Sequence, residues 1–279
     1  MAISAGQVKE LRERTGAGMM DCKKALEETG GDMEAAIDLL RSRGTAKAAK
    51  RAGKEATEGA IGLHIDTASG IGALVEVACE TDFVARTDNF QTLASRLAEH
   101  VATQAGTDGT ARGDELLDQK FQGGEQTVGE RITEVSAQTG ERIVVRRFAR
   151  FDAQDGPVAG YVHLTGKIGV LVEVSGAVAA ETARDVAMHI AAARPLAVSA
   201  DEIPEEVVER ERAVYLEQVR NEGKPENIQA KIVEGKLKKF YKESTLLEQP
   251  FVKDPERTVK ALLDSATVRR FVRYELGEE

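Results

Sequence analysis

Hydrophobic positions in the first 43 residues follow a helical spacing and predict three short helices. Ser4 can cap the first helix, residues 19–28 form the second, and Asp32 can cap the third. Gly-containing stretches, "TGAG" and "TGGD", separate them. Three helices in so few residues bury little surface, which is more typical of an adaptor than of an enzyme.

An internal repeat follows. "GLHIDTASGIGALVEV" (residues 62–77) resembles "GYVHLTGKIGVLVEV" (residues 160–174), and each alternates around a Gly-containing turn. Such a pattern predicts a β-hairpin. A helical pattern follows each hairpin, at 90–102 and at 181–195.

The two copies differ in the connection between hairpin and helix. His100 and His189 align within the two helices, and we expect them to have a packing role rather than to bind a ligand. Val77 and His100 are 23 positions apart, whereas Val174 and His189 are 15 apart, a surplus of eight residues in the first copy. "CETDFVARTDN" fills it, and loops longer than their connection requires often carry function.

The remaining segments of the chain outside residues 201–242 predict single elements. We predict a turn-rich exposed spacer at 102–114, a helix at 124–138 and a strand at 141–151. The end of the chain predicts a helix and a final strand at 268–276.

Residues 201–242 predict a helical hairpin with oppositely charged arms. Residues 201–223 contain eight acids and three bases, and residues 224–242 contain six bases and two acids. A turn, "NEGKPEN", separates the two helical patterns, so opposite charges would face each other across an antiparallel pair. The charges would hold the hairpin closed; a projecting arm for a partner is the alternative.

These patterns predict an α+β chain with a duplicated hairpin-plus-helix core of antiparallel sheets and a protruding helical hairpin. The expected divisions are a three-helix domain at 1–43, a basic linker at 44–58, the two core halves at 59–151 and 152–200, a coiled-coil hairpin at 201–243, and a C-terminal module packing on the core at 244–279.

The net charge of the chain bears on which classes of partner it can bind. The 279 residues carry a net charge of −9, which argues against nucleic acid or an anionic membrane as the main partner. The linker is locally basic: its side chains form either a solvated face or a contact strip for an acidic or phosphorylated partner. They are Lys47, Lys50, Arg51 and Lys54.

Cysteine use and the N-terminus favour a cytoplasmic protein. Cys22 and Cys79 are far apart in sequence and offer neither a disulfide framework nor a metal pattern. Lys9 and Glu10 precede any apolar run of useful length, so no signal peptide is expected. No apolar stretch is long enough to span a membrane.

Motifs of known chemistry are missing from the sequence. "GAGMMD" joins two predicted helices rather than a strand and a helix, and "TGKIG" lies in a hairpin turn without phosphate-loop spacing. The four histidines have no clustered carboxylate beside them in sequence. We therefore expect no enzyme activity, no cofactor and no bound metal.

Two long segments carry a family resemblance. "LRERTGAGMMDCKKAL" (residues 11–26) and "CETDFVAR" (residues 79–86) resemble the signature segments of elongation factor Ts, the guanine-nucleotide exchange factor of the bacterial GTPase elongation factor Tu. The order of modules is also similar, and it implies that the first domain is ubiquitin-associated-like. The resemblance covers nearly the whole chain.

The resemblance implies a function for the surplus loop. In the family an Asp-Phe tip inserts into the GTPase domain and disturbs its Mg²⁺ and phosphate site, which promotes GDP release. The matching residues here are Thr81, Asp82, Phe83 and Val84. The alternative is that Asp82 caps a helix and Phe83 staples it.

The resemblance implies further contacts with the GTPase. For docking on the GTPase domain the matching residues are Arg12, Met19, Met20, Lys23 and Arg51. Read alone, the two methionines could equally be core residues. For contact through the core the matching residues are Thr139, Gly140 and His163, of which His163 has a repeat counterpart in His64.

Two departures from the family pattern shape the expected assembly. The chain stops at "YELGEE", so the contact that a further C-terminal helix makes in some members is in doubt. Because the chain has both core copies, we expect a monomer that binds its GTPase one-to-one, with no direct contact to nucleic acid or membrane. Two other functions stay open: an RNA- or ribosome-associated adaptor using the basic strip, and an inhibitor that slows GDP release.

Overall fold

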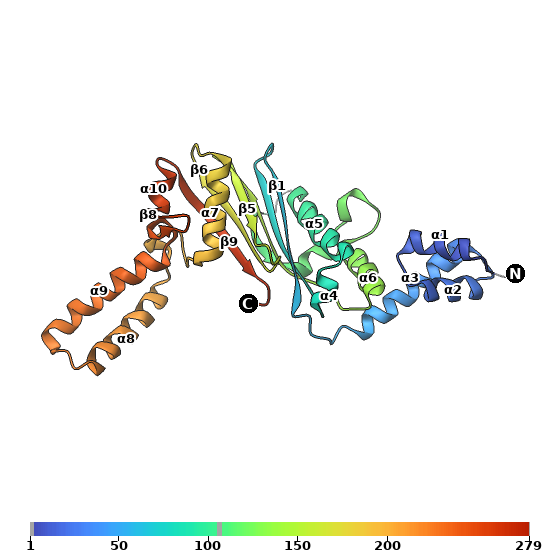
Figure 1. Ribbon diagram of the computed structural model, residues 1–279, viewed down its shortest axis with the longest axis horizontal. Helices are drawn as coiled ribbons and strands as arrows, with labels where there is room; N and C mark the ends of the chain where they lie inside the picture. The colour runs from blue at the N-terminus through green and yellow to red at the C-terminus, as the bar shows by residue number, and fades with distance from the viewer. Residues whose placement is uncertain (1–2, 105–107, 279) are drawn as a thin grey trace.

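The computed structural model describes residues 3–104 and 108–278. The molecule is elongated, with three helices at one end, two antiparallel sheets in the middle and a helical arm at the other end (Figure 1). This combination confirms the predicted α+β class. None of the helices in the described part of the chain has the length and apolar character needed to cross a bilayer.

The N-terminal domain consists of α1 (Ala5–Thr15), α2 (Met19–Glu28) and α3 (Met33–Lys50). Ser4 and Asp32 cap the first and third helices, as predicted: each side chain accepts a hydrogen bond from a backbone N–H in the first turn. Buried side chains from all three helices form a small separate core.

The segment 44–58, predicted as a basic linker, begins inside a helix. Helix α3 continues through Lys50, so the first part of this segment is helical. Only the residues between α3 and β1 connect the domain to the core. The Ala- and Lys-rich composition explains the extension, because both are good helix formers.

The N-terminal domain packs on the core. Gln138 Nε2 donates to the Thr15 carbonyl at 2.7 Å, and Arg41 pairs with Glu130 at 3.0 Å. Buried Gly44 allows α3 to approach closely, since a Cβ there would lie 2.7 Å from the Ala137 Cβ. The second half of α3 therefore packs directly against α6.

The first sheet has the order β1-β2-β4-β3 with all neighbours antiparallel. Its strands are β1 (Glu58–Asp66), β2 (Ile71–Cys79), β3 (Gly109–Arg112) and β4 (Val144–Asp152). The predicted exposed spacer at 102–114 is wrong in part: β3 pairs with β4 as an edge strand, and Gly113 is buried where β4 passes over it.

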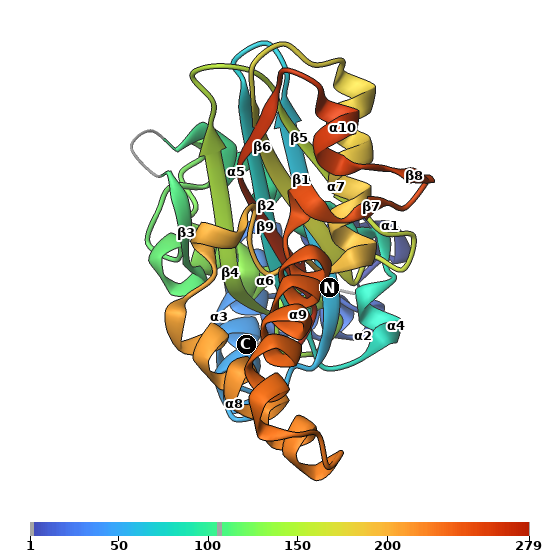
Figure 2. The ribbon, with the colours of Figure 1, turned by 90° about the vertical axis from the view of Figure 1, so that its left-hand side faces the viewer.

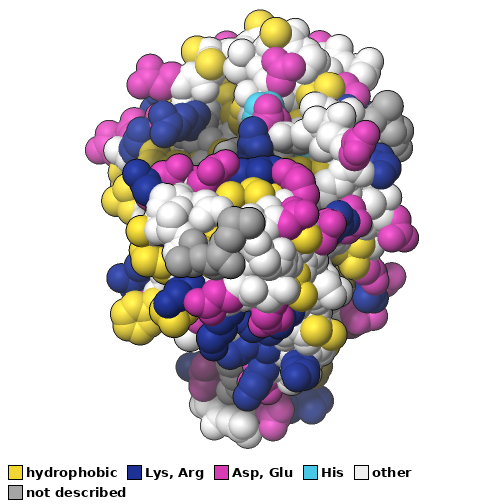
Figure 3. Space-filling model, turned by 90° about the vertical axis from the view of Figure 1, so that its right-hand side faces the viewer, with side chains coloured by type: hydrophobic (Ala, Val, Ile, Leu, Met, Phe, Trp, Pro, Cys, Tyr) yellow, Lys and Arg dark blue, Asp and Glu magenta, His cyan; other side chains and the backbone are white. Residues whose placement is uncertain are grey.

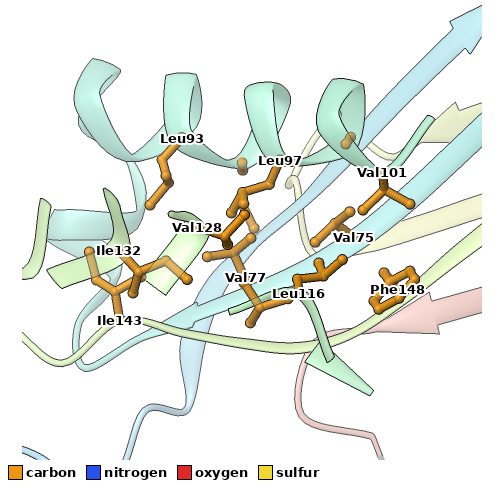
Figure 4. Packing of buried hydrophobic residues seen from close by; sticks show 14 of the residues in the cluster. Val75, Val77, Leu93, Leu97, Val101, Leu116, Val128, Ile132, Ile143 and Phe148 are labelled. Carbon is orange, nitrogen blue, oxygen red and sulfur yellow. The ribbon is translucent and has the colours of Figure 1, made fainter. Parts of the chain in front are cut away.

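Two helices cover the outer face of this sheet, α5 (Asp88–Thr103) and α6 (Val128–Thr139). Figure 4 shows Leu93, Leu97 and Val101 of α5 directed at side chains of β2. Helix α6 starts later than predicted, because Thr127 and Glu130 form a capping box there and the preceding residues turn through η2 (Phe121–Gly123).

The second sheet has the order β5-β6-β9, with strands β5 (Val158–Val162), β6 (Ile168–Ser175) and β9 (Thr267–Glu275). Helices α7 (Ala180–Ala193) and α10 (Val259–Leu263) contribute to its outer core. Because β9 pairs with β6 along its length, the C-terminal segment supplies a strand to the sheet of the second core half.

The repeat therefore covers the whole core, and the arm interrupts the second copy. "LLDQKFQ" (residues 116–122) corresponds to "LLEQPFV" (residues 246–252), and "VRRFARF" (145–151) corresponds to "VRRFVRY" (268–274). Residues 246–252 include η4 (Leu246–Glu248) and β7 (Pro250–Phe251), which pairs with β8 (Asp254–Thr258). In the first copy, η1 (Gly113–Leu116) ends at the first residue of 116–122.

The aligned histidines have the same buried environment in both copies. His100 Nε2 lies 3.1 Å from Gln119 Oε1, and its Nδ1 accepts from the Gln122 N–H at 3.3 Å. His189 repeats both contacts, at 2.9 Å with Gln249 Oε1 and at 3.2 Å with the Val252 N–H. Both rings are fully buried, which confirms the packing role and leaves no position for a ligand.

The two sheets pack face to face through a shared apolar layer. Arg147 pairs with Glu76 and lies 4.4 Å from the Tyr274 ring of the other copy. The equivalent contacts join Arg270 to Glu173 and, at 4.2 Å, to the Phe151 ring. This reciprocal pattern indicates an approximate twofold relation between the two copies.

The arm consists of α8 (Glu205–Asn221) and α9 (Glu226–Ser244) and projects away from the sheets (Figure 2). Its own small core is formed by Val219, Val233 and Leu237. Cross-helix ion pairs join Arg212 to Glu234 at 2.6 Å and Glu222 to Lys236 at 3.6 Å, which confirms the predicted pairing of an acidic with a basic helix. The short helix η3 (Ala200–Glu202) precedes α8 in the chain.

Candidate functional site: a clamped aromatic tip

The surplus loop of the first copy forms a very short helix, α4 (Asp82–Ala85), directly after β2. Its cap is Thr81, whose hydroxyl accepts from the Val84 N–H at 3.4 Å. The alternative that Asp82 caps the helix is therefore wrong; Asp82 instead pairs with Arg86 at 2.9 Å on the surface.

Phe83 points away from the protein, with 82% of its surface exposed. It does not staple the following helix, which begins at the separate cap Thr87. Val84 and Ala85 face the other way and pack on the core of the first sheet. One turn of helix thus carries an anchored side and an exposed aromatic side. We call residues 81–84 the tip.

A carboxylate from a distant loop holds the base of the tip. Glu141 accepts two hydrogen bonds from Thr81, at 2.6 Å from Oγ1 and at 3.0 Å from the backbone N–H. Sixty positions separate the two residues in sequence. The bond from Oγ1 uses a neutral donor and a charged acceptor, a strong class of hydrogen bond.

A second carboxylate ties the same region to the N-terminal domain. Glu80 accepts from Arg51 Nη1 at 2.7 Å and from the Arg142 N–H at 2.7 Å. The pKa of Glu80 is lowered, chiefly because the Arg142 N–H donates to it and further because Arg51 is close. Arg51, which the resemblance assigns to docking, therefore contacts the strand end beside the tip.

Cys79, the last residue of β2, is buried below the tip and donates to the Thr81 carbonyl at 3.2 Å. Burial, and after it the nearby Glu141 charge, raises the pKa of this thiol to about 12. A thiol held protonated is a poor nucleophile, so Cys79 acts as a packing and hydrogen-bonding residue.

Thr139 and Gly140 lie at the end of α6, immediately before Glu141. Gly140 has a left-handed backbone, φ 74°, and caps the helix by donating to the Ser136 carbonyl. The chain reverses there and brings Glu141 to the tip. Two residues expected at the partner contact are thus adjacent to the tip's support.

The turn after β5 lies at the same end of the core as the tip. Lys167 pairs with Glu58 at 2.6 Å, and Glu58 lies opposite Cys79 in the sheet. The turn exposes His163, which lies 3.3 Å from the Tyr161 hydroxyl, and leaves Leu164 98% exposed. Two large apolar side chains, Phe83 and Leu164, therefore project from this end.

The four predicted docking residues of the N-terminal domain all lie on its surface. Met19 and Met20 are 56% and 63% exposed at the start of α2, so the reading of these methionines as core residues is wrong. Arg12 and Lys23 are exposed on α1 and α2. Figure 1 draws α2 and α4 on the same lower side of the molecule.

The basic strip is partly neutralised within the protein. Lys47 pairs with Asp21 at 3.1 Å, and Arg51 pairs with Glu80. Viewed from the N-terminal end, acidic and basic side chains are intermixed over most of the face, with more Lys and Arg toward the bottom (Figure 3). Such a mixed surface gives little of the one-sign field that nucleic acids require.

A groove of about 1620 Å³ lies where the N-terminal domain meets α6 and the segment before it. Charges of both signs line it, including Arg14, Asp21, Lys24 and Glu130. Among residues 3–104 and 108–278, no three His, Cys, Asp or Glu side chains gather closely enough to hold a metal ion.

A known protein family matches most of the chain. Residues 80–278 match the family model described as Elongation factor TS. The chain belongs to the elongation factor Ts family. Within that match lie Phe83, Thr139, Gly140 and His163; the docking residues of the N-terminal domain precede it.

Full-length relatives extend the match to the N-terminal domain. The protein is similar to Elongation factor Ts of Thioalkalivibrio sulfidiphilus, with 49% identity over 280 residues, and of Methylococcus capsulatus, with 50% over 280 residues. Elongation factor Ts of Halothermothrix orenii is 46% identical over 283 residues. Each alignment covers 100% of this chain and 93% of the relative.

The sequence analysis missed three residues of this site: Glu80, Glu141 and Leu164. The two glutamates have no local signal, because their partners are far away in sequence. Leu164 had a local signal, because it is a large apolar residue in a hairpin turn. The other copy of the repeat has polar residues in this turn.

Proposed function

We propose that the protein is a guanine-nucleotide exchange factor for elongation factor Tu. It binds the GDP form of that GTPase and promotes GDP release by disturbing the Mg²⁺ and phosphate site, after which GTP binds. The observation that carries this proposal is the exposed Phe83 on a one-turn helix with an anchored base.

The tip has the physical properties that insertion requires. Burying an exposed phenylalanine gains about 1.5–3 kcal/mol, which can offset displacement of packed elements in the partner. Loss of Mg²⁺ and of phosphate hydrogen bonds then weakens GDP binding, since those contacts are charge-assisted. By linkage, nucleotide rebinding weakens the hold of the exchange factor by the same factor.

The surrounding residues fit a broad docking surface. Leu164 and His163 extend the contact on the core side, with Thr139 and Gly140 between them and the N-terminal domain. On that domain, Met19 and Met20 offer flexible apolar contact, which suits an adaptable interface. Arg12, Lys23 and Arg51 would supply charge at its rim.

The assembly we propose is one exchange factor with one GTPase, in the cytoplasm, without direct contact to nucleic acid or membrane. Both core copies lie in one chain, so a monomer has the complete surface. No bond is made or broken in this role, and the protein is not an enzyme in that sense.

The test is the release of a fluorescent GDP from purified elongation factor Tu at fixed Mg²⁺, with and without this protein. Acceleration that saturates with protein concentration would support the proposal. Binding without acceleration, or slowed release, would point instead to a dissociation inhibitor. Tight RNA binding at physiological salt would support the adaptor alternative.

A further inference from the structure

One side chain distant in sequence, Glu141, accepts two hydrogen bonds from the base of the tip. Thr81 caps α4, and both of its donor groups, the hydroxyl and the backbone N–H, end on the Glu141 carboxylate. The same hydroxyl accepts from the Val84 N–H, so a single chain of hydrogen bonds runs from Glu141 into the helix that carries Phe83.

Glu141 is itself fixed by the end of α6. Its carbonyl accepts from the Ser136 hydroxyl, and its N–H donates to Thr139 Oγ1 at 3.4 Å. The next residue, Arg142, is tied to Glu80 through its N–H at 2.7 Å. The carboxylate therefore projects from backbone that is held on both sides.

A four-residue helix needs such support. One turn of helix has too few internal hydrogen bonds to be stable in water, because nucleation costs more than a single turn returns. Packing of Val84 and Ala85 anchors one side. The cap attaches the N-terminal side of the helix, and Glu141 accepts both hydrogen bonds that the cap residue donates.

We propose that Glu141 is a positioning residue for exchange: it holds Thr81 so that Phe83 is presented in the orientation that enters the GTPase. The inference rests on the proposed function and deepens it. A pre-positioned aromatic side chain inserts without first losing conformational freedom, so more of its burial free energy is available to distort the nucleotide site.

The first experiment is Glu141→Gln in the GDP-release assay. A glutamine has one acceptor oxygen and places an NH₂ group against the second Thr81 donor. We expect the maximal release rate to fall about tenfold, the effect of losing one hydrogen bond to a charged group. The concentration giving half-maximal release should change much less, since the rest of the docking surface is intact.

The second experiment measures the tip directly and needs no partner. The chain contains no tryptophan, so Phe83→Trp places a single indole at the tip. Adding Glu141→Gln should increase the amplitude of the fast, local component of its fluorescence anisotropy decay in the free protein. Glu256→Gln, at an exposed residue of β8, is the matched control and should leave the decay unchanged.

Substitutions at Thr81 test whether Thr81 and Glu141 act through the same hydrogen bonds. Thr81→Ser keeps the hydroxyl that donates to Glu141 and accepts from the Val84 N–H, so it should lower the release rate less than Thr81→Ala does. Thr81→Ala should lower the release rate, and adding Glu141→Gln to it should cost less than Glu141→Gln does alone. Strictly additive losses would overturn the proposed chain of contacts.

The two readouts separate the two proposals. If Glu141→Gln leaves both the release rate and the tip's anisotropy unchanged, Glu141 does not position the tip. If the wild-type protein fails to accelerate GDP release but the anisotropy responds as expected, the exchange function is wrong, and Glu141 holds the tip without serving exchange. A fall in melting temperature with a wild-type release rate per folded molecule would make Glu141 structural only.

Discussion

Phe83 is the side chain on which the proposed exchange function depends most. We expect Phe83→Ala to lower the maximal GDP-release rate roughly 30-fold, because truncating a central interface residue costs about 2 kcal/mol or more. The free energy of unfolding should change by less than about 0.5 kcal/mol, since the side chain is 82% exposed. Stopped-flow release and urea unfolding measure the two quantities.

The control is an equally apolar side chain away from the tip. Leu196, just beyond α7, is 60% exposed. Leu196→Ala should leave both the release rate and stability near wild type. Wild-type exchange by Phe83→Ala would show that the tip is not the inserting element.

Because His100 and His189 are buried, we expect the folded state to lose stability in acid. Burial lowers the pKa of His100 and His189 below the ordinary value, more than their glutamine partners raise it. Both are neutral in the fold at pH 7, while in the unfolded chain they take up protons as the pH falls through about 6.5. Stability is thus complete above that pH and decreases below it, down to the folded pKa.

We therefore expect the free energy of unfolding to fall between pH 7.5 and pH 5.5, by up to about 1 kcal/mol per histidine. His189→Gln should be less stable at pH 7.5 but should lose less stability over this pH interval than the wild type. Urea unfolding at several pH values measures the slope. An unchanged slope in the variant would mean that His189 does not cause the acid sensitivity.

At the scale of elements, the arm should unfold independently of the core. Among its described side chains, the fully buried apolar ones are Val219, Val233 and Leu237, with partly buried side chains around them. Its ion pairs are exposed, so each adds little. Leu237→Ala removes one of three buried anchors at a cost of about 2–5 kcal/mol. We expect loss of helical circular dichroism and rapid proteolysis within α8 and α9, with the main melting transition of the core unchanged.

Val214→Ala is the control for the arm, because Val214 lies on the same helix pair and is 43% exposed. It should leave both the circular dichroism and the proteolysis pattern near wild type. A lower core transition in Leu237→Ala would show instead that the arm stabilises the sheets.

Element patterns also show where sequence reasoning reached its limit. Hairpins, helices and the arm followed from periodicity and capping, and the eight-residue surplus located the tip. The second copy was recognised only in part, because the arm separates its two segments: His100 and Gln119 are 19 positions apart, whereas His189 and Gln249 are 60 apart. Hydrogen bonds between distant loops, such as Glu141 to Thr81, have no periodic signal at all.

At the scale of the whole molecule, the two copies meet through closely approaching strands. Gly72 and Gly169 occupy equivalent positions in "IGALVEV" and "IGVLVEV". A Cβ at Gly169 would lie 2.4 Å from Ile61 Cγ2, and one at Gly72 would lie 2.5 Å from Val158 Cγ1. Both clashes cross from one copy to the other, so these glycines set the distance between the sheets.

The last prediction follows from that spacing. Gly169→Ala should destabilise the protein by about 1–3 kcal/mol, because the branched Ile61 side chain cannot rotate away without moving the sheets apart. Gly235→Ala lies in α9 with no atom within 4 Å of the added Cβ, and should stabilise the arm by about 0.5–1 kcal/mol. The same chemical change would thus have opposite signs at two sites, read by urea unfolding for the core and by helical circular dichroism for the arm. A neutral Gly169→Ala would mean that the two copies adjust their packing freely, and the tip and the turn at Leu164 could then not be held at a constant separation.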